Sequence, residues 1–347
     1  RHSLLAGAGA GTLSMQQTRL ARPVAAALLC ALVGCSDPDP PLPELSIDAT
    51  RISVSGISAG AYMAHQVHLV FSRTVDGAAL IAGGPYGCAQ GSLQTALADC
   101  MNPEQKSPNL AHLAATVRER AEAARIDPLA GLADDRVLVV HGRADRTVAS
   151  DVTTATADLY RALSDAAAVK QDLDHDFAHV FPTAAPGGCT ADDAHMADCN
   201  FDLAGEIVRY LIDADAKNAT MAQGALITFD QRAYADTEHD PRLSDRGYLY
   251  VPAQCREQAC GLHIAFHGCE MQADRVGTRF VEGAGYNRWA DKVSVVVLYP
   301  QVRSSMMPLN PKACWDWWGY TGSDYDTRDG AQMRWLKRVF AHFGVAA

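Results

Sequence analysis

A strand, a sharp turn and a helix are all required by one pentapeptide, Gly56-Ile57-Ser58-Ala59-Gly60. A strand is expected over residues 51–55, and a helix over residues 61–72, where apolar side chains recur at helical spacing. A serine held between small residues at such a junction exposes its hydroxyl at the edge of a sheet, beside the N–H groups of the helix start. The pattern predicts a nucleophilic Ser58. The alternative is a glycine-rich turn with an idle serine.

The rest of the chain alternates strands and helices, which is typical of a mostly parallel sheet with helices on both faces. Further strands are expected over residues 75–82, 136–140, 262–266 and 293–298, and helices over 201–212 and 328–343. No repeat or second linker follows residue 43. The sequence therefore predicts one α/β domain over residues 48–347.

A carboxylate partner for Ser58 is expected just after a buried strand. Asp145 follows the strand at 136–140, where it could orient a histidine and stabilise the imidazolium. Asp134 and Asp135 precede that strand and fall at the opposite edge of the sheet, while Asp151 is expected to N-cap the next helix. Asp145 is therefore the predicted acid. The alternative is a surface carboxylate.

His179 is the predicted base, because it lies among apolar residues and follows the serine and the acid in the chain. The order nucleophile, acid, histidine resembles that of the α/β-hydrolases. His175 stands among acidic residues and reads as solvated, and His141 precedes Asp145.

One strand is out of order for an α/β-hydrolase. The strand at 262–266 runs into His267-Gly268-Cys269, which resembles the oxyanion loop that normally precedes the nucleophile. Joining the C-terminus to about residue 48 restores the order, so we expect a circularly permuted α/β-hydrolase fold. The oxyanion hole would then use the backbone N–H groups of Ala59 and Cys269. A plain turn at His267-Gly268 is the alternative.

The N-terminal region resembles an export signal. Residues 1–14 lack a starting methionine, and one interpretation places the true start at Met15. An apolar run over 24–33 has the length of a signal-peptide core and ends before Cys35, as in bacterial lipoproteins, where Cys35 would be lipidated. The alternative is an ordinary secretory signal with an incidental cysteine. We expect residues 1–35 to be this signal and 36–47 to be a Pro-rich tether.

Eight cysteines remain beyond this region, and an even number in an exported chain predicts disulfides. They are Cys88, Cys100, Cys189, Cys199, Cys255, Cys260, Cys269 and Cys314. Short separations favour 88 with 100, 189 with 199, and 255 with 260, which leaves 269 with 314. Spacing alone leaves other pairings open, and none of the spacings forms a zinc pattern with histidine.

In this order, the motifs closely resemble those of the single-domain extracellular poly(3-hydroxybutyrate) depolymerases. The blocks that carry the resemblance cover most of the chain after the signal and lie at 55–64, 83–88, 145–148, 179–182, 247–252, 265–269 and 314–320. The resemblance implies a triad of Ser58, Asp145 and His179, an oxyanion N–H from Cys269, and polyester or hydroxyacid oligomer as substrate. It also implies that a tryptophan of the last block lines the substrate crevice. Trp315, Trp317 and Trp318 are the candidates, with Trp317 or Trp318 favoured.

The resemblance implies no cofactor or metal. With a net charge of −10, the chain has no basic character that suggests nucleic acid. We expect an exported monomer that meets a membrane only through a lipid at Cys35, and adsorption to polymer through the catalytic domain itself. The alternatives are a feruloyl or acetyl esterase, a general short-chain carboxylesterase, and a non-catalytic binding lipoprotein on a hydrolase scaffold.

Overall fold

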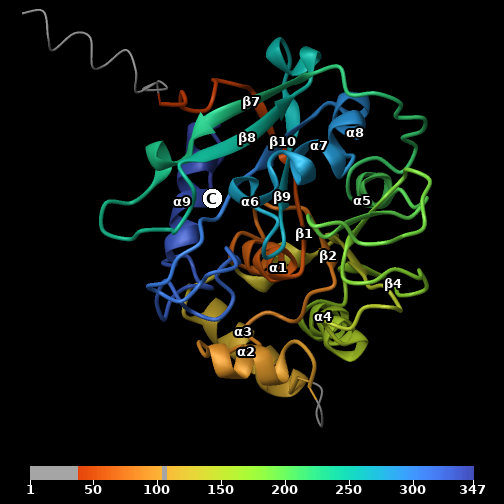
Figure 1. Cartoon of the computed structure of the whole chain (residues 1–347). Coiled ribbons are helices and arrows are strands. Elements are labelled where there is room, and N and C mark those ends of the chain that lie inside the picture. Colours follow the sequence, from red (N-terminus) through yellow and green to blue (C-terminus); the bar gives the residue numbers. More distant parts are fainter. Residues whose placement is uncertain (1–37, 104–107) are drawn as a thin grey trace, which may run out of the picture. The chain divides into compact units, whose positions relative to one another are not determined.

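A twisted, mostly parallel sheet runs through the middle of the molecule (Figure 1). The computed structural model describes residues 38–103 and 108–347, so the predicted signal and Cys35 lie outside the described residues. Within those ranges, eight strands form one sheet in the order β7-β8-β10-β9-β1-β2-β3-β4. Their bounds are β1 Ile47–Ile57, β2 Gly77–Ile81, β3 Arg136–Val140, β4 Ala168–Asp172, β7 Ala225–Asp230, β8 Arg246–Val251, β9 Cys260–Phe266 and β10 Val295–Tyr299. Strand β8 is antiparallel to both of its neighbours, and every other neighbouring pair is parallel.

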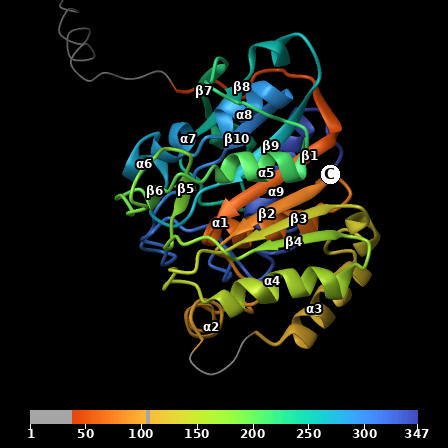
Figure 2. The same cartoon turned by 90° about the vertical axis from the view of Figure 1, so that its right-hand side faces the viewer.

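Helices cover both faces of this sheet, as predicted (Figure 2). They are α1 Ala59–Val70, α2 Leu93–Asp99, α3 Leu110–Glu122, α4 Ser150–Leu163, α5 Leu203–Leu211, α6 Ala273–Val276, α7 Arg279–Gly283, α8 Tyr286–Val293 and α9 Ala331–His342. A short parallel pair, β5 (Phe181–Thr183) and β6 (Met196–Asp198), stands apart from the main sheet. In the part of the chain that the structure describes, no helix is both long and apolar enough to cross a bilayer.

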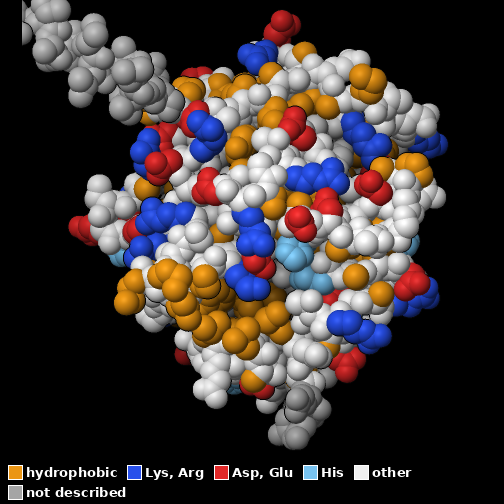
Figure 3. Space-filling model, in the orientation of Figure 1, with side chains coloured by type: hydrophobic (Ala, Val, Ile, Leu, Met, Phe, Trp, Pro, Cys, Tyr) orange, Lys and Arg blue, Asp and Glu red, His pale blue; other side chains and the backbone are white. Residues whose placement is uncertain are grey.

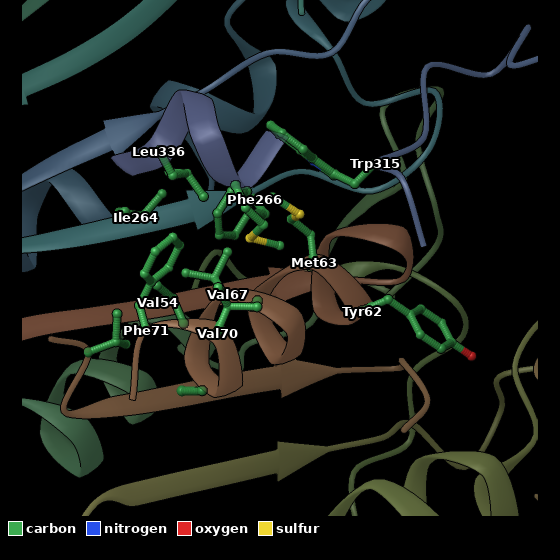
Figure 4. Packing of buried hydrophobic residues seen from close by; sticks show 14 of the residues in the cluster. Val54, Tyr62, Met63, Val67, Val70, Phe71, Ile264, Phe266, Trp315 and Leu336 are labelled. Carbon is green, nitrogen blue, oxygen red and sulfur yellow. The ribbon is translucent and has the colours of Figure 1, made fainter. Parts of the chain in front are cut away.

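The core has two layers because successive strand residues point to opposite faces. In β3, Val137 and Val139 belong to a core cluster that includes residues of α1, α3, α4 and α9, whereas Leu138 and Val140 belong to a second cluster with residues of α5, α7 and α8. Figure 4 shows the first layer, in which Val67 and Val70 of α1 face Val54 and Ile264 of the sheet. Burial on both faces explains why the central strands are continuous apolar runs.

The two ends of the domain lie side by side. His342 at the end of α9 lies 3.3 Å, through Nε2, from the carbonyl oxygen of Pro43, and Thr74 donates to the carbonyl of Ala346 at 2.9 Å. Joining these ends would give the strand succession β7, β8, β9, β10, β1, β2, β3, β4, which places the oxyanion-loop strand β9 before the nucleophile strand β1. The predicted circularly permuted α/β fold is confirmed.

The segment before residue 48, which was expected to be a Pro-rich tether, contacts the sheet. Residues 39–347 form one compact unit. Asp39 accepts a hydrogen bond from Thr228 of β7 at 2.6 Å, and the Leu42 side chain is buried. Much of the predicted tether is therefore packed against the sheet edge, since its apolar and acidic side chains find partners there.

Two local predictions were wrong. Asp151 does not N-cap α4, because Ala149 holds that position and Asp151 lies in the first turn. The strand expected from residue 293 begins at Val295, because α8 continues through Val293 and Ser294 makes a left-handed turn at φ 54°.

Candidate active site

Ser58 stands alone between β1 and α1, in a backbone conformation that L-residues rarely adopt, with φ 56° and ψ −123°. Its N–H donates to the carbonyl of Ile81 at 2.9 Å, which ties the turn to β2. A Cβ on Gly56 would lie 2.1 Å from the oxygen of Gly60, and a Cβ on Gly60 would lie 2.4 Å from the oxygen of Phe266. Both glycines are therefore required by space, and the strained turn is held by its surroundings.

The structure brings His179 and Asp145 together. The two atoms His179 Nδ1 and Asp145 Oδ2 are 2.7 Å apart. The other carboxylate oxygen, Oδ1, accepts the backbone N–H groups of Thr147 at 2.7 Å and Val148 at 3.1 Å. Asp145 is held by the turn that follows β3, so the imidazole of His179 is oriented by a fixed acceptor and its Nε2 is free of this bond.

The surroundings of Asp145 favour its ionised form. Burial raises the pKa of Asp145, but the hydrogen bonds and charge of His179, with the two backbone donors, outweigh it and hold the pKa below its ordinary value of 3.8. The nearby His141 donates through Nε2 to the carbonyl of Val148 at 2.9 Å, which supports the same turn. The arrangement provides an ionised carboxylate behind a half-buried histidine.

Ser58 and His179 line one cavity of about 230 Å³. The other lining residues are Ile57, Met101, Thr147, His195, Gly268, Cys269, Glu270, Met271 and Lys312. The sequence analysis did not predict His195, Glu270 and Lys312, because they belong to no motif and meet only through the packing of loops. The cavity joins the predicted nucleophile, the predicted base and the predicted oxyanion loop.

The loop after β9 lies against the nucleophile turn. The Nδ1–H of His267 donates to the carbonyl of Gly268 at 2.7 Å, and its Nε2 accepts the Val302 N–H at 3.3 Å. Burial lowers the pKa of His267 to about 4, so the ring is neutral and both bonds are compatible with one tautomer. Within residues 38–103 and 108–347, no acceptor is assigned to the N–H of Ala59 or Cys269. Both groups are available to an oxyanion.

The described residues contain four disulfides. Three are the pairs that short separations favour, Cys88–Cys100, Cys189–Cys199 and Cys255–Cys260, and the fourth is the remaining pair, Cys269–Cys314. The last pair fixes the oxyanion loop to the loop that carries the three tryptophans. Disulfides of this number fit an oxidising, extracellular environment.

The three tryptophans are more buried than a crevice lining requires. Trp315 is fully buried and packs edge-on against Phe266 at 4.9 Å between ring centroids. Trp317 stacks on Tyr62 at 4.2 Å, and Trp318 meets Trp317 edge-on at 5.6 Å. None of the three is among the residues that line the 230 Å³ cavity. Among the described residues, no group of three or more His, Cys, Asp or Glu side chains is placed to hold a metal ion.

The fold and the arrangement at Ser58 are those of an α/β-hydrolase. No family model matches the chain. It is 36% identical to a poly(3-hydroxybutyrate) depolymerase of Delftia acidovorans over 92% of this chain, and it spans 65% of that relative's length. It is 30% identical to a polyhydroxybutyrate depolymerase of Talaromyces funiculosus, over 84% of this chain and 89% of the relative.

Two solved structures of PHB depolymerases resemble this chain. The crystal structure of a PHB depolymerase from Penicillium funiculosum matches with a TM-score of 0.78 at 28% identity, over 87% of this chain and 99% of the other. A PHB depolymerase variant in complex with an R3HB trimer matches with a TM-score of 0.77, at the same identity and coverage. The chain belongs to the poly(3-hydroxybutyrate) depolymerase family, a family of carboxylic ester hydrolases.

Proposed function

We propose that this chain hydrolyses the ester bonds of poly(3-hydroxybutyrate) or its short oligomers through an acyl-enzyme on Ser58. The observation that carries the proposal is the Asp145–His179 pair, with its 2.7 Å bond, in the same cavity as a serine on a strand-to-helix turn. Relatives whose names state this activity, and a structural neighbour in complex with an R3HB trimer, support the substrate class.

The proposed chemistry has two acyl-transfer steps. His179 accepts the proton of Ser58 as the serine oxygen attacks the ester carbonyl, and the oxyanion is bound by the N–H groups of Ala59 and Cys269. The ester C–O bond breaks, and the alcohol end leaves with the proton from His179. Water, deprotonated by His179, then attacks the acyl-enzyme and releases the hydroxyacid and Ser58.

An apolar surface on the face of the active site supports a hydrophobic substrate. Figure 3 shows hydrophobic side chains gathered over the loops that follow β10, on the face where histidine side chains also emerge. The exposed apolar side chains of these loops are Met306, Met307 and Leu309, which are 74%, 86% and 52% exposed. A patch of large exposed apolar side chains marks an interaction surface, and a polyester is a fitting occupant. Trp317 and Trp318, which keep a small exposed fraction, remain proposed crevice residues, whereas the fully buried Trp315 is proposed only to support them.

The proposal also covers where the protein is located and whether it assembles. We propose export, with Cys35 as a lipid anchor and a monomeric catalytic domain. Palmitate labelling of the full chain, compared with Cys35→Ser, tests the anchor. Loss of label in the variant would support it, and secretion of both proteins without label would favour an ordinary signal.

The test of function compares the wild type with Ser58→Ala on amorphous poly(3-hydroxybutyrate), by clearing and by acid release. Release by the wild type alone would support both the substrate and the nucleophile. Hydrolysis of p-nitrophenyl butyrate, with polymer and hydroxybutyrate oligomers left intact, would reject the depolymerase assignment and leave a general esterase.

A further inference from the structure

A cluster of charged side chains forms one wall of the catalytic cavity. Glu270 and Lys312 both line it, and Lys312 Nζ lies 3.0 Å from Glu270 Oε2. The other oxygen of Glu270 lies 3.0 Å from the guanidinium of Arg275. The nearby His195 lies 4.0 Å, through Nε2, from Glu270. Charged side chains of both signs alternate beside the histidines on this face (Figure 3).

This cluster is positive in an otherwise acidic protein. Two cations share one carboxylate, and the hydrogen bond from Lys312 holds the pKa of Glu270 below its ordinary value, so that carboxylate is ionised at neutral pH. Burial lowers the pKa of His195, so its ring adds no charge there. The three-residue cluster of Lys312, Glu270 and Arg275 therefore carries one net positive charge beside the cavity, while the whole chain carries −10. A cation at this place would not help to bind a neutral polymer segment.

The backbone of Lys312 is held against the predicted oxyanion loop. The N–H of Glu270 donates to the carbonyl of Lys312 at 2.7 Å, and the Cys269–Cys314 disulfide joins the same two loops. The ammonium group is therefore carried by a loop that is tied to the neighbouring loop of Cys269, whose N–H faces the oxyanion in the proposed mechanism. Its side chain is 64% exposed, so it can reach an anion at the cavity mouth.

The chemistry of a hydroxyacid polyester identifies the anion that Lys312 could bind. The substrate has one charged group, the carboxylate at its acid end, and that end lies on the alcohol side of every ester bond in the chain. A carboxylate close to the scissile ester therefore belongs to the leaving hydroxyacid. A short oligomer or a chain end presents it within reach, whereas an internal segment of polymer does not.

We propose that the Lys312–Glu270–Arg275 cluster binds the terminal carboxylate of hydroxyacid oligomers and makes the enzyme favour the ester nearest the acid end. This inference rests on the proposed function and specifies its substrate as an anionic oligomer. The net positive charge of this cluster, at a partly exposed site, would favour the acid form by about twofold to fivefold in kcat/KM, which low salt would enlarge.

The experiment uses the linear trimer of 3-hydroxybutyrate as its free acid and as its methyl ester, with cleavage of the internal ester bonds followed by chromatography. We compare the wild type with Lys312→Met, which keeps the stem and the backbone carbonyl. Lys170→Met is the matched control, because it removes the same charge from the edge strand β4, where Lys170 lies 4.0 Å from Glu206.

The expected result is a wild-type preference for the acid that Lys312→Met removes, through a higher KM for the acid alone, and that Lys170→Met retains. Raising the salt concentration to about 0.5 M should shrink the preference. Equal rates on acid and ester in the wild type, or an equal loss on both in Lys312→Met, would overturn the inference while leaving the esterase intact. Hydrolysis of neither trimer by a wild type active on p-nitrophenyl butyrate would overturn the proposed function and the inference together.

Discussion

His179 and Asp145 are joined by a 2.7 Å bond between Nδ1 and Oδ2, and the second oxygen of the same carboxylate is occupied by two backbone N–H groups. Neither oxygen can rotate away without losing hydrogen bonds in a buried place. The carboxylate is therefore a fixed acceptor, and the ring of His179 has one orientation in which its other nitrogen faces the cavity.

Asp145→Asn should lower kcat by about a thousandfold or more while the protein stays folded, because an amide does not hold the required tautomer or stabilise the imidazolium. The rate is measured with p-nitrophenyl butyrate. Asp134→Asn is the control, since Asp134 is an exposed residue ahead of β3 and should keep full activity. A variant at 145 with more than about a tenth of the wild-type kcat would mean that another group orients His179.

Acid should destabilise the protein from about pH 6.5 downward through buried histidines. Burial lowers the pKa of His65 and His263 to about 3, and that of His267 to about 4, from an ordinary value of 6.5. Between these values the unfolded chain binds protons that the folded protein does not, so the free energy of unfolding falls as pH falls. Each such group contributes up to about 1.4 kcal/mol per pH unit.

Urea unfolding at a series of pH values measures this slope. His263→Gln should flatten it by about one proton between pH 6 and 4, whereas His112→Gln, at an exposed position on α3, should leave it unchanged. His263 lies 2.8 Å from both Ser53 Oγ and Ser55 Oγ, so the amide also retains part of this hydrogen bonding. An unchanged slope in His263→Gln would show that His263 is charged in the folded protein.

Removing the Cys269–Cys314 disulfide should reduce both stability and rate. The loss of stability is expected to be about 2–4 kcal/mol. The value of kcat should fall at least about tenfold, because the loop that presents the Cys269 N–H is no longer bonded to the loop that carries the three tryptophans. The variant is Cys269→Ser with Cys314→Ser. The matched control is Cys255→Ser with Cys260→Ser, at the opposite end of β9. That control should lose stability with kcat unchanged, and a similar fall of kcat in both would contradict the assignment.

Gly60→Ala should impair folding and activity together. The new methyl would lie 2.4 Å and 2.5 Å from the backbone oxygens of Phe266 and His267, and these atoms belong to the central sheet and the oxyanion loop. A destabilisation of about 3 kcal/mol is expected from such overpacking. Thermal unfolding measures it, with Gly188→Ala as the control, because the nearest atom to a Cβ there is 3.9 Å away on Thr190. Normal stability in Gly60→Ala would show that β9 can shift away from α1.

The strands that flank the motifs could be predicted from the sequence, but the strands at the two edges of the sheet, β4 and β7, could not. β3 is a buried apolar run, and β1 ends in a pentapeptide that allows one geometry, so both are encoded locally. β4 has the partly polar sequence Ala168-Val-Lys-Gln-Asp172, because an edge strand need not be apolar on both faces. The other edge strand, β7, has half-exposed positions along most of its length and was missed for the same reason. Strand β8 is mostly buried between β7 and β10, and its short run, broken by Gly247, was also not predicted.

For the site, chain order and motif context were enough to select Ser58, Asp145 and His179. The fold places Ser58 and His179 on one cavity and joins His179 to Asp145. The charged wall of Glu270 and Lys312 could not be predicted, since its members meet only through the packing of two loops. The same packing buries the tryptophans of the 314–320 block, whose composition suggested a more open groove.

The permuted order of the strands has a consequence for biosynthesis. β1, the first strand to leave the ribosome, lies in the centre of the sheet, and its neighbour β9 is made only after some two hundred further residues, as the pairing of Ile52 with Leu262 shows. Such non-local pairing slows folding. Cys88–Cys100 and Cys189–Cys199 can close early, but Cys269–Cys314 cannot form until residue 314 has been made. The nascent chain therefore carries Ser58 long before it carries Cys269 and Lys312, which line the same cavity.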